Sequence, residues 1–104
     1  MSSTFPCGCS KKWIKITDLE TPCVEDNAKF AIEEFNIKHN GSLRYKKVIE
    51  GWCKELDESH IRYRLLVQAN DCLRRLLEFE AIVFAHYSEN GETTRILESF
   101  EQRF

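Results

Sequence analysis

The spacing of hydrophobic residues changes once along the chain, from a helical repeat to a strand repeat. Between residues 21 and 38, apolar residues recur every three or four positions, which predicts an amphipathic helix. Thr21 suits the N-cap and Pro22 the first helical position, and Gly41 is expected to end the helix with a positive φ. The apolar stripe of this helix consists of Val24, Ala28, Ala31, Ile32 and Phe35.

The segments around the helix alternate apolar and polar residues with a period of two, which predicts strands. Trp13 to Thr17 forms a short strand before the helix, and four more follow it. The alternation slips near Lys47 and Val48, which indicates a bulge. Hairpin-length connections lie at residues 54–59, 70–75 and 88–92, the last with an Asn-Gly turn signal. The predicted core face of the two central strands carries Ile61, Tyr63, Leu65, Val67 and Ala69, and Leu77, Phe79, Ala81, Val83 and Ala85.

This order of elements predicts the fold class. It contains no strand-helix-strand alternation, so the sheet should be antiparallel. We expect an α+β fold, with one long helix packed across a curved antiparallel sheet of about five strands. The 104 residues suit one domain. Residues 1–12 are expected to form a flexible N-terminal arm, and residues 13–104 the domain.

Composition narrows the classes of function. Hydrophobic residues make up 42% and charged residues 31%, with interleaved signs and a net charge of −2. We therefore expect no nucleic-acid partner and no membrane partner. The three histidines lie far apart, and no acid, base and nucleophile occur together, so we expect no enzyme, no cofactor and no metal. A nucleophilic pair of Cys53 and His60 across a hairpin is the weaker alternative.

Five cysteines leave at least one thiol unpaired, which fits a reducing compartment better than a disulfide scaffold. Cys7 and Cys9 are expected to be free thiols on the arm, with a redox or metal role as the alternative. The first residues lack the apolar stretch of a signal peptide. We therefore expect either a cytoplasmic chain or a secreted chain whose signal has been removed, and the sequence does not decide between them. The glycosylation acceptor at Asn40 matters only if the chain is secreted.

The sheet face away from the helix has two interpretations. One is a solvated face with cross-strand charge pairs, and the other is a patch that binds a partner or a second copy. We expect a monomer, with a sheet-face dimer or strand exchange through the first hairpin as the alternatives. This face carries Leu66, Ile82 and Phe84, with Arg62 and Arg64 expected opposite Glu78 and Glu80.

Several segments together resemble the plant cystatins. They are "AKFAIEEFN" in the helix, "W-I-x-I-x-D" before it, and "L-x-Y-x-x-V-I-x-G", "YRLLVQAND", "FEAIVF" and "LESFE" in the strands. The resemblance runs from Trp13 to Glu101, and monellin, on the same fold, is also similar, including a Cys near Cys53. It implies the cystatin fold and occlusion of the cleft of papain-like cysteine proteases. The family's wedge combines a glycine-containing arm, a Gln-x-Val-x-Gly first hairpin loop and a Pro-Trp second hairpin loop.

This chain departs from the family pattern in all three parts of the wedge. Glycine occurs in the arm only as Gly8, five residues before Trp13. Only Leu56 keeps the apolar character of the first loop, and Tyr87 is the one candidate for the aromatic anchor of the second. The protease-binding residues that the resemblance implies are Gly8, Lys54, Glu55, Leu56, Asp57, Glu58, His86 and Tyr87.

The changed first loop predicts weakened or altered inhibition. Burying an unpaired charge costs several kcal/mol per ion. That cost could offset most of the roughly 12 kcal/mol that nanomolar binding requires, and loss of an aromatic anchor removes about 2 kcal/mol or more. The alternative is a non-inhibitory binding protein that keeps a monellin-like scaffold with reworked loops.

Overall fold

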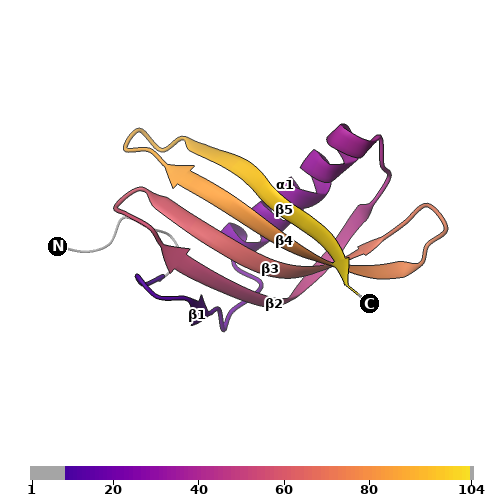
Figure 1. Ribbon diagram of the computed structural model, residues 1–104, viewed down its shortest axis with the longest axis horizontal. Coiled ribbons are helices and arrows are strands. Elements are labelled where there is room, and N and C mark those ends of the chain that lie inside the picture. The colour runs from indigo at the N-terminus through magenta and orange to yellow at the C-terminus, as the bar shows by residue number, and fades with distance from the viewer. Residues whose placement is uncertain (1–8, 104) are drawn as a thin grey trace.

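A single helix lies across one face of a five-stranded antiparallel sheet in the computed structural model, which describes residues 9–103 (Figure 1). This is the expected α+β, cystatin-like architecture. Sheet order follows chain order, because each strand pairs with the next one along the sequence. The elements are β1 (Ile14–Lys15), α1 (Pro22–His39), β2 (Arg44–Glu55), β3 (His60–Asn70), β4 (Leu76–Tyr87) and β5 (Thr93–Arg103).

The core lies between α1 and the sheet. Period-two alternation places every second residue of β3 and β4 against the helix, as the sequence predicts. Small residues of the helix let the sheet approach it closely. The apolar side chains with no exposed surface are Val24, Ala28, Ala31, Ile61, Tyr63, Leu65, Val67, Ala69, Ala81, Val83 and Ala85.

Both ends of α1 lie where the sequence predicts them, but the capping at the C-terminal end differs. The left-handed residue is Asn40, with φ 51°, and not Gly41. Gly41 is required for a different reason, since a Cβ there would lie 2.9 Å from the side-chain oxygen of Asn36. That side chain is held in place because its amide donates to the carbonyl of Leu43 at 2.9 Å and its oxygen accepts from the Leu43 N–H at 3.0 Å.

Irregularities in β2 and the short β1 shape the edge of the sheet. Register shifts between Tyr45 and Lys47 and between Val48 and Glu50 confirm the predicted bulge. β1 has only two residues, fewer than predicted, although Ile16 still donates its N–H to the carbonyl of Gly51 at 2.8 Å. No helix within residues 9–103 is long and apolar enough to cross a membrane.

The expectation that the cysteines of the arm are free thiols is wrong for Cys9. Cys9 forms a disulfide with Cys53, across 44 residues of sequence and with 5.8 Å between the Cα atoms. The two residues meet because Ile14 pairs with Cys53, which brings the preceding residues beside the end of β2. Cys23 is also disulfide-bonded. Cys72 remains an exposed free thiol, and Cys7 lies outside the described residues.

On the sheet face away from the helix, which we call the open face, Arg62 and Arg64 form ion pairs as expected, but the partner expected for Arg62 was wrong. Arg62 stands opposite Phe84 in the register and binds Glu98 of β5 at 2.7 Å. Arg64 reaches Glu80 diagonally at 2.5 Å. Both arginine side chains therefore have ion-pair partners within the sheet.

Candidate functional site

Three segments meet at one end of the sheet, which we call the hairpin edge: residues 9–12, residues 56–59 and residues 87–92. Figure 1 places the β2–β3 and β4–β5 connections at the same end of the sheet, opposite the α1–β2 connection. Tyr87 donates its N–H to the carbonyl of Ser59 at 2.8 Å, which joins the two hairpin loops. Glu55 donates its N–H to the carbonyl of Ser10 at 2.6 Å, which joins the arm to the first loop.

The first loop is shorter than the motif alignment implies. Lys54 and Glu55 lie within β2, paired with Arg62 and Ile61 of β3. The loop itself comprises residues 56–59. In it Leu56 is half-buried, whereas Asp57 and Glu58 are exposed. The exposed tip of this loop is therefore acidic.

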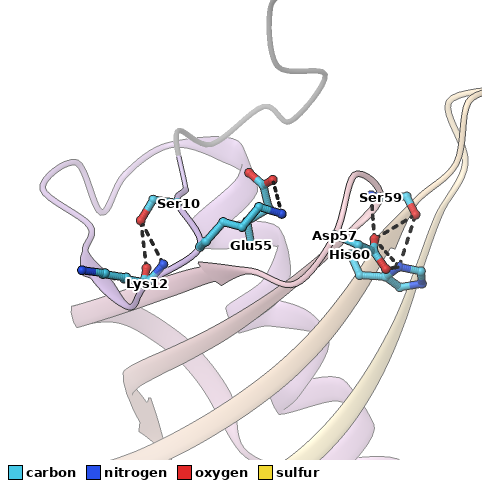
Figure 2. A network of polar contacts seen from close by, with 7 residues as sticks. Ser10, Lys12, Glu55, Asp57, Ser59 and His60 are labelled. Carbon is cyan, nitrogen blue, oxygen red and sulfur yellow. Dashed lines mark hydrogen bonds and ion pairs between the residues drawn. The ribbon is translucent and has the colours of Figure 1, made fainter.

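Asp57 organises the first loop by accepting several hydrogen bonds. Its carboxylate accepts from the Ser59 N–H at 2.9 Å and from the Ser59 hydroxyl at 3.3 Å, and it contacts His60 Nδ1 at 2.7 Å (Figure 2). The Ser59 N–H, followed by the His60 side chain, lowers the pKa of Asp57 to about 2. The loop is thus a closed turn whose acceptor is already occupied by its own residues.

His60, the first residue of β3, lies next to this edge, and the sequence did not indicate its role there. Its ring stacks on His86 with 4.5 Å between centroids and on Phe84 with 5.1 Å. The pairing of β3 with β4 places His60 directly opposite His86, a signal that needs the strand register. The alternative of a Cys53 and His60 nucleophilic pair is wrong, because the sulfur of Cys53 is bonded to Cys9.

Tyr87 points into the core at the base of the second loop. Its hydroxyl lies 2.8 Å from the hydroxyl of Tyr63, which has no exposed surface. Burial, followed by the hydrogen bond with Tyr87, raises the pKa of Tyr63. The loop beyond it is polar and exposed from Glu89 to Glu92, and Gly91 adopts φ 90° in the expected Asn-Gly turn.

The arm contributes through its last residues before β1. Gly8 lies outside the described residues. Cys9 is half-buried against the core, and Lys11 approaches Glu55 at 3.8 Å. Within residues 9–103 no cluster of three or more metal-ligating side chains occurs.

A family model described as "Phloem filament protein PP1 cystatin-like domain" matches residues 22–100. The chain belongs to this cystatin-like family. The matched span includes α1 and both hairpins of the hairpin edge, while the arm and β1 precede it. The family and the fold that the motifs predicted are both confirmed.

Two plant proteins show similarity over parts of this cystatin-like chain. "Cysteine proteinase inhibitor 8" of Oryza sativa subsp. japonica is 29% identical over 89 residues, which cover 86% of this chain and 68% of the rice protein. "Cysteine proteinase inhibitor 1" of Actinidia chinensis var. chinensis is 34% identical over 59 residues. That match covers 57% of this chain and 49% of the kiwifruit protein. Both relatives are named as inhibitors and not as enzymes.

Proposed function

We propose that the hairpin edge enters the active-site cleft of a papain-like cysteine protease and inhibits it weakly. The observation that supports this is the contact between the two loops and the arm, through Tyr87 with Ser59 and Glu55 with Ser10. A continuous edge can occlude a cleft without contributing any catalytic group. The names of the rice and kiwifruit relatives agree with this class of partner.

Weak inhibition follows from what the edge exposes. Asp57 and Glu58 would lose water on entering a cleft, and each buried ion without a matching charge costs several kcal/mol. Asp57 is partly compensated by Ser59 and His60, but Glu58 has no hydrogen-bond or ion-pair partner within residues 9–103. Tyr87 is held by Tyr63 in the core, so it does not supply the missing aromatic anchor without leaving that contact.

An inhibition titration tests this proposal. Papain that has been activated and then freed of reductant should be inhibited with a dissociation constant in the micromolar range, corresponding to roughly 8 kcal/mol. Nanomolar inhibition would show that the acidic residues of the first loop do not weaken binding. Lack of inhibition at hundreds of micromolar, with the protein folded by circular dichroism, would contradict protease binding itself.

Loop variants test whether the charged loop is the cause of weak inhibition. A full graft replaces residues 54–58 through Lys54→Gln, Glu55→Val, Leu56→Val, Asp57→Ala and Glu58→Gly. It should strengthen inhibition by at least tenfold, because it removes charge from the surface that the cleft would bury. A second variant that changes only residues 56–58 should give most of this gain, since Lys54 and Glu55 belong to β2. Equal inhibition by the native chain and both grafts would refute the role of the charged loop.

A second candidate is a non-inhibitory binding protein on the cystatin fold. The closed turn at Asp57 favours it, because such a turn presents acidic groups and not the apolar strip that a protease cleft receives. A pull-down with the native chain, compared with the residue 56–58 variant, distinguishes the two. Capture of a protein other than a protease, lost in the variant, together with failure to inhibit a panel of papain-like enzymes, would favour this candidate.

We further propose that the protein is a monomer in solution. The cations Arg62 and Arg64 of the open sheet face already have partners within the chain, which lowers the gain from covering that face. Light scattering after size exclusion should give a mass near 12.3 kDa. A mass twice as large would support the sheet-face or strand-exchanged dimer instead.

A further inference from the structure

The Cys9–Cys53 disulfide attaches the arm beside the first hairpin loop. We propose that this disulfide is a redox latch: it sets the position of the arm at the hairpin edge and thereby sets the affinity of that edge for a protease. This inference rests on the proposed function, and it adds a means of regulating the same site.

The location of the disulfide gives it this influence. Cys53 lies two residues before the end of β2, so only Lys54 and Glu55 separate it from the first loop. Its side chain is 2% exposed, and the disulfide therefore joins the arm to a fixed point of the core. Next to it, the carbonyl of Ser10 accepts the N–H of Glu55 at 2.6 Å. The disulfide thus holds residues 10–12 against the strand end that leads into the loop.

Both ends of the short arm segment are attached at the same residue. Ile14 pairs with Cys53 through the β1–β2 ladder, and Cys9 is joined to Cys53 through sulfur. Residues 10–13 therefore form a small closed loop on the edge of β2. Breaking the disulfide removes the covalent one of these two attachments to Cys53, and residues 10–13 gain conformational freedom.

The remaining described contacts of this segment are weak. The Lys11 and Glu55 ion pair spans 3.8 Å, and the lysine side chain is 76% exposed, so it contributes little to holding the arm. The hydrogen bonds between Ser10 and Lys12 join neighbours within the arm and do not attach it to the sheet (Figure 2). The hydrogen bond from Glu55 to Ser10 remains, and it depends on the arm staying in place.

The redox step needs a dithiol reductant. One thiolate of the dithiol attacks a sulfur of the Cys9–Cys53 bond, which breaks and releases the other cysteine sulfur as a thiolate. The second dithiol sulfur then displaces the first from the mixed disulfide. Two electrons and two protons pass to Cys9 and Cys53, which become thiols, while the dithiol becomes a cyclic disulfide. Reoxidation requires a disulfide oxidant and reverses the exchange.

The expected consequence is tighter protease binding in the oxidised state. An arm that is already ordered loses less conformational entropy on entering a cleft, and immobilising even a few side chains changes affinity by on the order of tenfold. Reduction should weaken binding by about this factor. The rest of the fold should persist, because Cys53 is only one member of the core between α1 and the sheet and the other buried members stay in place.

The test compares the oxidised full chain, the dithiol-reduced chain and the double variant Cys9→Ser with Cys53→Ala. Cys72→Ser is the matched control, because Cys72 is an exposed free cysteine outside the hairpin edge. Hydrogen exchange at the Glu55 N–H reports the position of the arm without any protease. Calorimetric binding to papain whose catalytic thiol carries a small blocking group reports the affinity under either redox condition.

The latch predicts faster exchange at Glu55 and about tenfold weaker binding in the reduced chain and in the double variant, with Cys72→Ser unchanged in both readouts. Unchanged exchange at Glu55 would overturn the latch. Faster exchange with equal or stronger binding would overturn its control of affinity. Faster exchange with no binding in any state would instead refute the proposed function, and with it the regulatory consequence, while leaving the attachment of the arm established.

Discussion

The helix-covered face of the sheet and the hairpin edge are held together by different kinds of contact. The covered face is filled by apolar side chains from α1 and from β2 to β5, eleven of them without exposed surface. The hairpin edge depends on the carboxylate of Asp57, on stacked rings at His60 and on the Cys9–Cys53 disulfide. Apolar burial is therefore concentrated in the covered face, while the proposed binding surface is held by polar contacts, stacked rings and a disulfide.

This difference explains how the chain can keep a family fold while its loops change. A substitution on the covered face alters packing that many residues share. A substitution in residues 56–59 alters a turn whose polar contacts are with its own neighbours. The edge can therefore accept acidic residues without a large loss of stability, and measurements on matched variants can test this contrast.

The largest expected effect comes from paired leucine truncations in the two regions. Leu65→Ala removes a side chain with no exposed surface and should lower the free energy of unfolding by about 2–5 kcal/mol. Leu56→Ala in the half-buried first loop should cost about 1 kcal/mol. Urea unfolding followed by circular dichroism measures both. Similar losses would show that the edge is as tightly packed as the core.

Asn27 is the next test, because it is a polar side chain with no exposed surface on the helix. Its amide donates to the carbonyl of Cys23 at 2.5 Å, and its oxygen accepts from Arg95 Nε at 2.8 Å. Asn27→Ala should cost about 1–3 kcal/mol, since Arg95 loses its acceptor. The exposed neighbour Asp26→Ala is the control and should change stability by about 0.5 kcal/mol or less. Equal losses of stability in the two variants would show that the buried amide of Asn27 makes no special contribution to stability.

The hydroxyl pair of Tyr63 and Tyr87 lies where the covered face meets the edge. Tyr63→Phe should lower the free energy of unfolding by about 1 kcal/mol near neutral pH, because the hydrogen bond between the two hydroxyls is lost. Burial raises the pKa of Tyr63 above the ordinary 10.0, so the folded state favours the neutral phenol. The stability this provides is complete below pH 10 and falls as the pH rises further.

Unfolding at pH 8 and pH 11, with tyrosinate absorbance as a second signal, measures this dependence on pH. The wild type should lose stability between the two values, and the loss should be smaller in Tyr63→Phe. An identical loss in both proteins would assign the alkaline sensitivity to other groups.

The smallest effect is expected at Asp57 and is local. Its pKa of about 2 lies below the ordinary 3.8, so the contacts of the charged carboxylate are complete above pH 3.8 and are lost as the pH falls toward 2. Asp57→Asn should accelerate hydrogen exchange at the Ser59 N–H, with the urea midpoint nearly unchanged. Glu58→Gln, at the exposed neighbour, should leave that exchange rate unaltered. A large shift of the urea midpoint in Asp57→Asn would contradict a purely local turn.

Local pattern was sufficient for the covered face. The period of 3.6 predicted the extent of α1 and most of its buried residues, but Phe35 is only half-buried, and the buried Cys23 and Asn27 were missed. The period of two predicted which side of β3 and β4 packs against the helix. The identity of the left-handed residue, Asn40 and not Gly41, was missed. Both residues are good helix stops, and Gly41 is required instead by its close approach to Asn36.

The sequence predicted where the loops of the hairpin edge lie along the chain, but it did not predict their geometry. Its loops follow from hairpin-length connections and from the family resemblance. The inward direction of Tyr87 and the stacking of His60 on His86 depend on the register of three strands. The length of the first loop was misjudged, because Lys54 and Glu55 continue the pairing of β2 with β3 beyond the point where apolar alternation ends.

The sequence by itself determined the elements, the antiparallel order and the cystatin-like family of this protein, because hydrophobic periodicity is a local property that one sheet face and one helix stripe must satisfy. Only the tertiary structure decided that Cys9 meets Cys53, that Arg95 meets Asn27 and that Tyr87 turns toward Tyr63. These partners lie 44, 68 and 24 residues apart. Such contacts arise from strand register and helix placement, which no local repeat specifies.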